Sequence, residues 1–210
     1  MLELCTLASG SSGNSLLVTD GRTHVLVDAG ISCRRICTGL KELGVEPTEL
    51  AGVLITHEHS DHISGLTTLT KQLRLPVYAS PGTGRQLCYR IAFLEELEEH
   101  HFLPVVRFMV ESSRERDFSV EALAPVYLRH KGETMEWVRE TGEMLRDLEM
   151  AGYLTIDYGY ALENYPYTEY RESELYAYFC RTIEEGRERP GFLGDTPVLE
   201  LGSIAPSYED

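Results

Sequence analysis

The chain has 210 residues, of which 19 are Lys or Arg and 34 are Asp or Glu, so its formal net charge is −15. This length suits one large domain or two small ones, and the negative charge argues against broad contact with nucleic-acid phosphates or anionic membranes. No apolar run approaches the ~20 residues of a membrane-spanning helix, the N-terminus lacks the basic region of a signal peptide, and the cysteines are odd in number, so we expect a cytoplasmic protein with reduced thiols.

Charge is divided unevenly along the chain. Residues 1–93 contain eight acidic and eight basic residues, whereas residues 94–210 contain 26 acidic and 11 basic ones. Ten of the twelve tyrosines also follow Phe93. This step in composition predicts two domains, an α/β domain over residues 1–93 and an acidic, Tyr-rich α+β module over residues 94–210.

The first part of the chain alternates strand and helix patterns. Apolar stretches predict strands over residues 2–7, 16–19, 23–27, 51–55 and 76–79, and the Asp20-Gly21 pair predicts a two-residue hairpin turn. Helical spacing predicts helices over residues 33–43, 63–73 and 87–94, the first capped by Ser32 and ended by Gly44. This alternation is typical of a layered α/β domain.

The second part is predicted to be mainly helical. Apolar spacing indicates helices over residues 104–110, 119–128 and 134–150, followed by a strand over residues 153–160 in a short hairpin. This order suggests a winged-helix-like unit, and because Arg139 and Arg146 stand among acidic residues, it would contact protein rather than DNA. The tyrosines could form a stacking platform for bases or sugars, or pack the hairpin against the helices, which is the more frequent arrangement.

One motif in the sequence contains the residue types of a metal-binding site. His57-x-His59-x-Asp61-His62 places four metal-binding side chains in six residues, after a predicted buried strand. Ligand sites in α/β sheets favour that edge. In an extended segment His57 and His59 project to one side and could bind one metal ion, while Asp61 and His62 turn toward a second. Two ions could stabilise both oxygens of a displacement and lower the pKa of a bound water to about 7.

The same residues resemble a known family. HEHSDH at 57–62 and LVDAG at 26–30 are similar to motifs of the metallo-β-lactamase superfamily, and ASGSSGNS at 8–15 and LITHEHSDHISGL at 54–66 are similar to its small bacterial WalJ-type (YycJ-type) branch. The resemblance covers residues 1 to about 93. It implies the first half of an αββα sandwich with a dinuclear metal site that hydrolyses phosphodiester or ester bonds, and the WalJ-type branch implies DNA exonuclease activity.

Carried over to this chain, the resemblance implies a role for each motif residue. His57 and His59 would bind the first ion, and Asp61 and His62 the second. Asp61 would also be the catalytic residue, because it would orient the attacking water or take its proton. Asp28 would steady the metal-binding loop through hydrogen bonds from behind the ligands. The loop over residues 9–14 would line the same edge.

The family also draws three ligands from its second half. His130 is the candidate for the first of them, and Asp157, in a segment similar to the family's DTGY, is the candidate for the aspartate that bridges the ions. No histidine follows His130, and Phe192 stands near the position of the last ligand. The metal site is therefore incomplete in any alignment that keeps chain order.

Two functions are compatible with this sequence. The first is a metal-dependent hydrolase, possessing one or two ions of zinc, or else of manganese or iron, and using a metal-bound hydroxide on a small-molecule or nucleic-acid phosphoester. The second is a binding or regulatory protein that joins an incomplete metallo-β-lactamase half domain to a winged-helix-like interaction module. Half a sandwich leaves an apolar face that the acidic part, a second copy of the chain in a homodimer, or a protein partner could cover.

Overall fold

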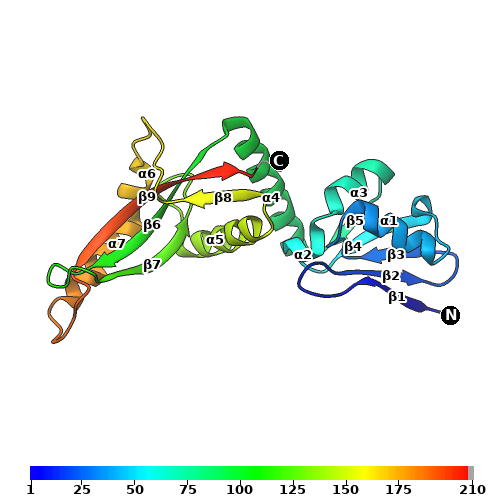
Figure 1. The fold of residues 1–210 in the computed structure, drawn as a ribbon, viewed down its shortest axis with the longest axis horizontal. Coiled ribbons are helices and arrows are strands. Elements are labelled where there is room, and N and C mark those ends of the chain that lie inside the picture. Colours follow the sequence, from blue (N-terminus) through cyan, green and yellow to red (C-terminus); the bar gives the residue numbers. More distant parts are fainter. Residues whose placement is uncertain (208–210) are drawn as a thin grey trace. The chain divides into compact units, whose positions relative to one another are not determined.

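A computed structural model describes residues 1–207, and the chain folds into two compact units, Met1–Phe93 and Leu94–Asp210 (Figure 1). The boundary falls at the step in charge and tyrosine content. Each unit combines helices with a sheet, so the protein has an α/β fold. Within residues 1–207, no helix is both long enough and apolar enough to cross a membrane.

The first unit is built on a five-stranded mixed sheet. Its strands lie in chain order, namely β1 (Glu3–Ala8), β2 (Ser15–Thr19), β3 (His24–Val27), β4 (Leu50–Ile55) and β5 (Val77–Ala79). The first three are antiparallel neighbours, whereas β3, β4 and β5 run parallel. All five predicted strands are confirmed. The β2–β3 connection has four residues rather than two, because the Asp20 carboxylate accepts hydrogen bonds from the backbone N–H groups of Arg22 and Thr23.

Helices cover one face of this sheet. They are α1 (Cys33–Glu42), the short 3-10 helix η1 (Pro47–Glu49), α2 (Ser60–Ile63), α3 (Leu66–Leu73) and α4 (Pro81–His100), which begins in this unit. Ser32 caps α1 by accepting from the backbone N–H of Arg35, and Gly44 follows it with a φ of +75°, as predicted. The core joins α1 and α3 to β3 and β4 through buried side chains that include Leu26, Ile36, Leu40, Val53, Ile55 and Leu69.

The other face of the same sheet is apolar and less covered. The register places Leu16, Val27 and Leu54 side by side on neighbouring strands. Their neighbours in sequence, Leu17, Leu26 and Ile55, are buried in the core, so these three side chains project from the opposite face. Leu54 is 41% exposed. The first unit therefore has the apolar face that half a sandwich would leave uncovered.

The second unit is built on a four-stranded antiparallel sheet in the order β7-β6-β9-β8. Its strands are β6 (Leu103–Glu111), β7 (Ser119–Val126), β8 (Leu154–Asp157) and β9 (Thr196–Pro206). The helices predicted over residues 104–110 and 119–128 are wrong, because both segments are strands. Periodicity alone does not separate a short apolar run in a strand from one in a helix, and the pairing of β6 with β9, far along the chain, decides the outcome.

The remaining elements of the second unit are helices packed on this sheet. The predicted helix is confirmed as α5 (Met135–Met150), whereas α6 (Thr168–Arg171) and α7 (Glu174–Gly186) were not predicted. Phe108 of β6, Val138 of α5 and Phe179 of α7 belong to one hydrophobic cluster. The expectation of a mainly helical second part is wrong, since a sheet forms its centre, and a winged-helix arrangement is not confirmed.

Two tyrosines lie in this core. Tyr167 and Tyr170 are buried, and their hydroxyls donate to the backbone carbonyls of Gly202 and Pro104 at 2.7 and 2.8 Å. Burial raises the pKa of Tyr170 well above its ordinary value. Both tyrosines therefore pack in the core, with their hydroxyls bonded to backbone carbonyls. Tyr160 and Tyr178 are exposed.

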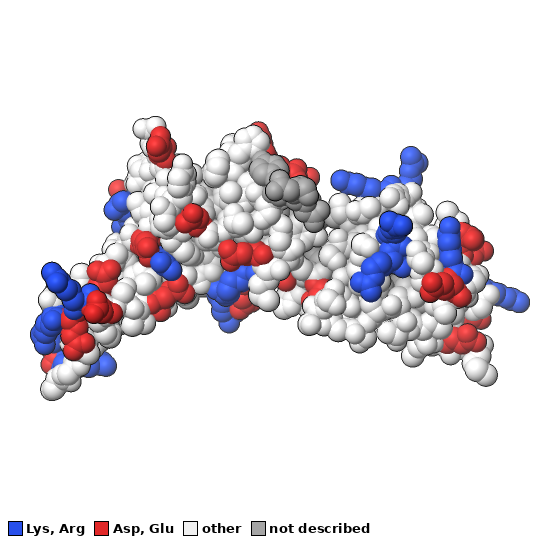
Figure 2. Space-filling model, viewed as in Figure 1, with Lys and Arg blue, Asp and Glu red and all other residues white. Residues whose placement is uncertain are grey.

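Charged side chains are dispersed over the surface. On the face shown in Figure 2, the acidic side chains of the second unit are scattered among a few Lys and Arg side chains and do not gather in one patch. The first unit shows both signs of charge on the same face. On this face the negative charge of the second unit is therefore spread out rather than concentrated.

Candidate metal centre

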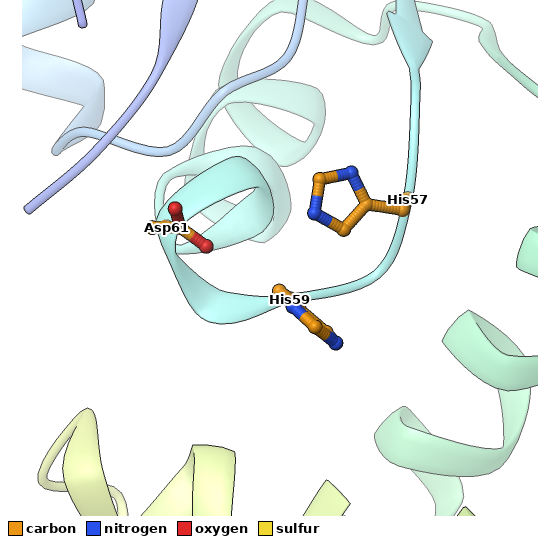
Figure 3. A group of neighbouring side chains, drawn as sticks. All are labelled: His57, His59 and Asp61. Atoms are coloured by element: carbon orange, nitrogen blue, oxygen red, sulfur yellow. The ribbon is translucent and has the colours of Figure 1, made fainter. Parts of the chain in front are cut away.

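The candidate metal centre lies where β4 passes into α2 (Figure 3). His57 and His59 stand in the connecting loop, and Asp61 lies in the first turn of α2. One ligand atom from each of these three residues lies within 4.8 Å of the others. The rings of His57 and His59 have centroids 4.9 Å apart. Three of the four predicted motif ligands are therefore brought together.

This donor set fits a divalent transition-metal ion. Imidazole nitrogens and carboxylate oxygens are the ligands that zinc, manganese and iron share in proteins. His59 is exposed, while His57 and Asp61 are half-buried, so the group opens to solvent. A site with three protein ligands and an open side is typical of a catalytic ion rather than a structural one.

Asp28 holds the loop and the fourth histidine from behind. Its side chain is 8% exposed, and its backbone has a φ of 61°. The carboxylate accepts from the backbone N–H and the hydroxyl of Thr56, both at 2.8 Å, and lies 2.8 Å from Nδ1 of His62. Because a carboxylate only accepts, Nδ1 of His62 is the donor in this contact. Asp28 thus contacts both the loop and His62 from behind.

His62 lies beside the three-residue cluster. Its ring centroid is 3.8 Å from that of His57, and its Nε2 is 3.4 Å from Oδ2 of Asp61. That nitrogen also lies 3.2 Å from Nδ2 of Asn14. His62 is therefore adjacent to the predicted ligands but already has hydrogen-bond partners at both ring nitrogens.

Backbone hydrogen bonds join the segments around the centre. Asn14 N–H donates to the carbonyl of Asp61 at 2.7 Å, and Gly30 N–H donates to the carbonyl of Asn14 at 2.9 Å. A Cβ atom at Gly30 would lie 1.6 Å from the carbonyl oxygen of Asp61, so only glycine fits there. The loop over residues 9–14 lines this edge as predicted. The individual roles of Asn14 and Gly30 were missed, although both lie in the motifs that carried the resemblance.

Arg90 was also missed and supports the loop from α4. Its guanidinium donates to the carbonyl of Glu58 at 3.3 Å and to the hydroxyl of Ser60. Arg90 is buried, so the contact fixes the backbone that carries His59. No motif in the sequence signals this role, because the arginine belongs to a helix about thirty residues further along the chain.

His130 and Asp157 both lie in the second unit, outside the three-residue cluster. His130 follows β7, its side chain is 69% exposed, and its Nε2 lies 3.3 Å from Glu133. Asp157 ends β8, and its Oδ1 accepts from the backbone N–H of Gly159 at 2.7 Å. Each therefore has a local partner within the second unit.

Comparisons with known proteins agree with the motifs. Residues 8–151 match the metallo-beta-lactamase superfamily, so the match continues beyond Phe93. Exodeoxyribonuclease WalJ of Streptococcus pneumoniae serotype 2 is 31% identical over 181 residues, which cover 82% of this chain and 65% of that protein. Exodeoxyribonuclease YycJ of Bacillus anthracis is 44% identical over 82 residues, 39% of this chain and 31% of that protein.

The chain thus spans less than two thirds of the length of these relatives. Among solved structures, Rm3 metallo-beta-lactamase is similar with a TM-score of 0.36 and 32% identity, covering 40% of this chain and 32% of the other. Members of this superfamily bind divalent metal ions, in agreement with the cluster of His57, His59 and Asp61. The family match extends over more than half of the sequence. The chain therefore belongs to the metallo-beta-lactamase superfamily.

Proposed function

We propose that this chain is a metal-dependent hydrolase of phosphodiester bonds, with DNA as its substrate class. The observation that carries the proposal is the convergence of His57, His59 and Asp61 within 4.8 Å. The similarity to exodeoxyribonucleases WalJ and YycJ supports the choice of DNA. Anchoring of the loop by Asp28 and Arg90 supports a preorganised site rather than a chance cluster.

Each residue of the centre has a proposed role. His57, His59 and Asp61 hold a zinc ion, with manganese and iron as the other ions suited to these donors. When bound, such an ion supplies a water activated near neutral pH and stabilises charge on a phosphoryl oxygen. Asp61 orients the attacking water or accepts its proton. His62, oriented by Asp28, lies next to this carboxylate.

The second unit has a proposed part in the same site. His130 and Asp157 are the candidates for further ligands, as the resemblance implies. A loss of zinc affinity in His130→Ala or Asp157→Ala, with the fold unchanged, would support this role. Affinity equal to the wild type in both variants would assign the complete ligand set to the first unit.

Charge limits the kind of DNA contact. The net charge of −15 opposes a long interface with phosphates, since negative side chains repel the DNA backbone and few basic ones offset them. The first unit, with eight acidic and eight basic residues, lacks this excess of negative charge. We therefore propose a substrate held through few phosphates, such as the end of a strand.

The experiment measures zinc content and DNA hydrolysis in the same preparations. Wild type, purified without chelator, should contain zinc and release nucleotides from end-labelled DNA. His59→Ala should lose zinc and lower the rate by more than about 100-fold. That is the largest loss expected when a residue that only supports a metal ligand is replaced. His100→Ala is the matched control, because His100 is exposed at the end of α4. Equal zinc content and equal rates in wild type and His59→Ala would contradict the proposal.

A second candidate function is a binding protein with a partial metal site. The observation that favours it is the step in composition after Phe93, where 26 acidic residues stand against 11 basic ones. In this case the acidic unit would bind a protein partner or a second copy of the chain. Zinc binding without hydrolysis of DNA or a chromogenic phosphodiester, together with a dimer in sedimentation experiments, would favour it. Limited proteolysis between residues 94 and 103 should then release a stable C-terminal fragment.

A further inference from the structure

Two cysteine side chains meet on α1, away from the candidate metal centre. The Sγ atoms of Cys33 and Cys37 are 4.0 Å apart, and both residues line a cavity of about 530 Å³ between α1 and α3. Cys33 is buried and Cys37 is half-buried. The pair therefore presents two neighbouring sulfur atoms at the wall of a cavity.

The helix does not favour a disulfide between these two residues. They stand four positions apart, and the Cβ atoms of such a pair on a helix lie about 5–6 Å apart. A disulfide needs Cβ atoms about 3.5–4.5 Å apart. A metal ion has no such requirement, because two metal–sulfur bonds of about 2.3 Å span the distance of 4.0 Å without moving either sulfur. The pair therefore suits a bridging ion better than a disulfide.

The side chains around the pair favour a soft ion that needs few ligands. Within residues 1–207, the lining of this cavity includes two thiols but no histidine, aspartate or glutamate. Structural zinc almost always takes four ligands from these residue types, and here it would find only two. Thiolates select copper(I), which is stable with fewer ligands than zinc.

The charge of the cavity favours a monovalent ion. Binding replaces the protons of both thiols, so the complex of a monovalent ion releases two protons and carries one negative charge. Arg34 and Lys41 line the same cavity, and their positive charges stabilise such a complex. A divalent ion would form a neutral complex, which these side chains would stabilise less.

Gln72 of α3 supports Cys33 in both protonation states. Burial and the neighbouring Cys37 raise the pKa of Cys33 to about 11, so this thiol stays protonated until an ion displaces its proton. In the protonated form, its Sγ donates to Oε1 of Gln72 at 3.3 Å. The NH2 group of the same amide can donate to the thiolate once the proton has left.

We propose that Cys33 and Cys37 form a copper(I)-binding site, separate from the centre of His57, His59 and Asp61. The observation that carries this inference is the approach of two sulfur atoms to 4.0 Å at a cavity lined by basic side chains. The inference does not depend on the proposed hydrolase activity.

The test measures transfer of copper(I) to the protein from its coloured bicinchoninate complex, under argon and with ascorbate. The wild type should take up one ion per chain and gain the ultraviolet absorption of copper–thiolate bonds. Cys33→Ser and Cys37→Ser should each lose this absorption. Cys88→Ser is the matched control and should keep it, because Cys88 is exposed on α4.

The role of charge has its own pair of variants. Arg34→Gln removes a positive charge from the cavity and should weaken copper(I) binding by up to about five-fold, the range of an exposed ion pair. Arg35→Gln removes the same charge from the next residue of α1. In the part of the chain that the structure describes, Arg35 does not line the cavity, so its affinity should stay at the wild-type value.

The outcomes separate this site from the candidate metal centre. His59→Ala should keep the copper–thiolate absorption, and loss of that absorption in this variant would place the ion at the other centre and overturn the proposal. Wild-type absorption in both Cys33→Ser and Cys37→Ser would also overturn it. Displacement of copper(I) by an equal amount of zinc would contradict the choice of a monovalent ion. Circular dichroism checks folding, and Cys37→Ser decides the test if the substitution of buried Cys33 unfolds the protein.

Discussion

Asp28 and His62 are joined by a hydrogen bond of 2.8 Å between Oδ2 and Nδ1, although 34 positions separate them in sequence. Asp28 ends the β2–β3 hairpin, and His62 lies in α2, beyond the end of β4. The parallel pairing of β3 and β4 brings the ends of both strands to one edge of the sheet. This bond sets the orientation of the imidazole and leaves Nε2 facing Asp61.

Replacing Asp28 by asparagine should reverse the proton arrangement on His62. The amide NH2 of the new side chain would donate to Nδ1, so the ring proton would move to Nε2. Because Asp28 also accepts two hydrogen bonds from Thr56, next to His57, the substitution loosens the loop that carries the proposed ligands. We therefore expect zinc affinity to fall by about 10- to 100-fold in Asp28→Asn. Competition with a chromogenic chelator measures the affinity, and ring nitrogen shifts of His62 report the tautomer.

Asp20→Asn is the control for this change. Asp20 also accepts backbone hydrogen bonds, but in the β2–β3 turn rather than beside the metal-binding loop. Its zinc affinity should equal that of the wild type. An Asp28→Asn protein with wild-type affinity would show that the metal-binding loop does not depend on Asp28.

Two glycine substitutions in the first unit should have opposite effects on stability. In Gly30→Ala the new Cβ would overlap the carbonyl of Asp61, so we expect a loss of about 3 kcal/mol in the free energy of unfolding, together with weaker zinc binding. In Gly84→Ala the Cβ meets nothing within 4 Å on α4, so helix propensity should stabilise the protein by about 0.5–1 kcal/mol. Urea unfolding measures both changes in the free energy of unfolding. A Gly30→Ala protein as stable as the wild type would contradict the close approach of Gly30 to the carbonyl of Asp61.

The buried hydroxyl of Tyr170 should contribute measurably to the stability of the second unit. It donates to the carbonyl of Pro104 and accepts from the N–H of Leu128 at 3.4 Å. Tyr170→Phe leaves both backbone groups without this partner, so we expect a loss of about 1–3 kcal/mol. Tyr178→Phe is the control, because its ring is 60% exposed. Equal free energies of unfolding for the two variants, measured by chemical denaturation, would show that packing alone holds Tyr170.

Acid should weaken the second unit through Asp195. Hydrogen bonds from the hydroxyl and backbone N–H of Ser113 lower the pKa of Asp195 to about 2. An unfolded aspartate titrates near 3.9, so this contribution is present above about pH 4 and is lost as the pH falls toward 2. The denaturation midpoints of wild type and Asp195→Asn should therefore differ most above pH 4 and converge in acid. Asp117→Asn, on the exposed surface, should show no such convergence.

The sequence predicted the first unit well because its signals are local. The hairpin, the cap at Ser32 and the buried run of β4 each depend on residues close in the chain. The metal motif is also local, so His57, His59 and Asp61 could be named in advance. The support from Arg90 could not, because it depends on how α4 packs against the loop.

The second unit was harder to predict because its sheet is assembled from distant segments. β6 pairs with β7 nearby but also with β9, which no local pattern marked as a strand. Val105 and Val106 favour a strand, yet the apolar run around them also matched helical spacing. Tyr167 and Tyr170 pack against this sheet from the segment around α6, and composition alone could not place them there.

X-ray absorption at the zinc edge of the loaded wild-type protein tests the metal centre most directly. His57, His59 and Asp61 predict a first shell of nitrogen and oxygen only, at about 2.0–2.2 Å, with the outer scattering of imidazole rings. The chain also has five free cysteines, which would place sulfur at about 2.3 Å if they held the ion. A nitrogen and oxygen shell with imidazole scattering is the predicted result. A sulfur shell, or protein that retains no zinc, would contradict it.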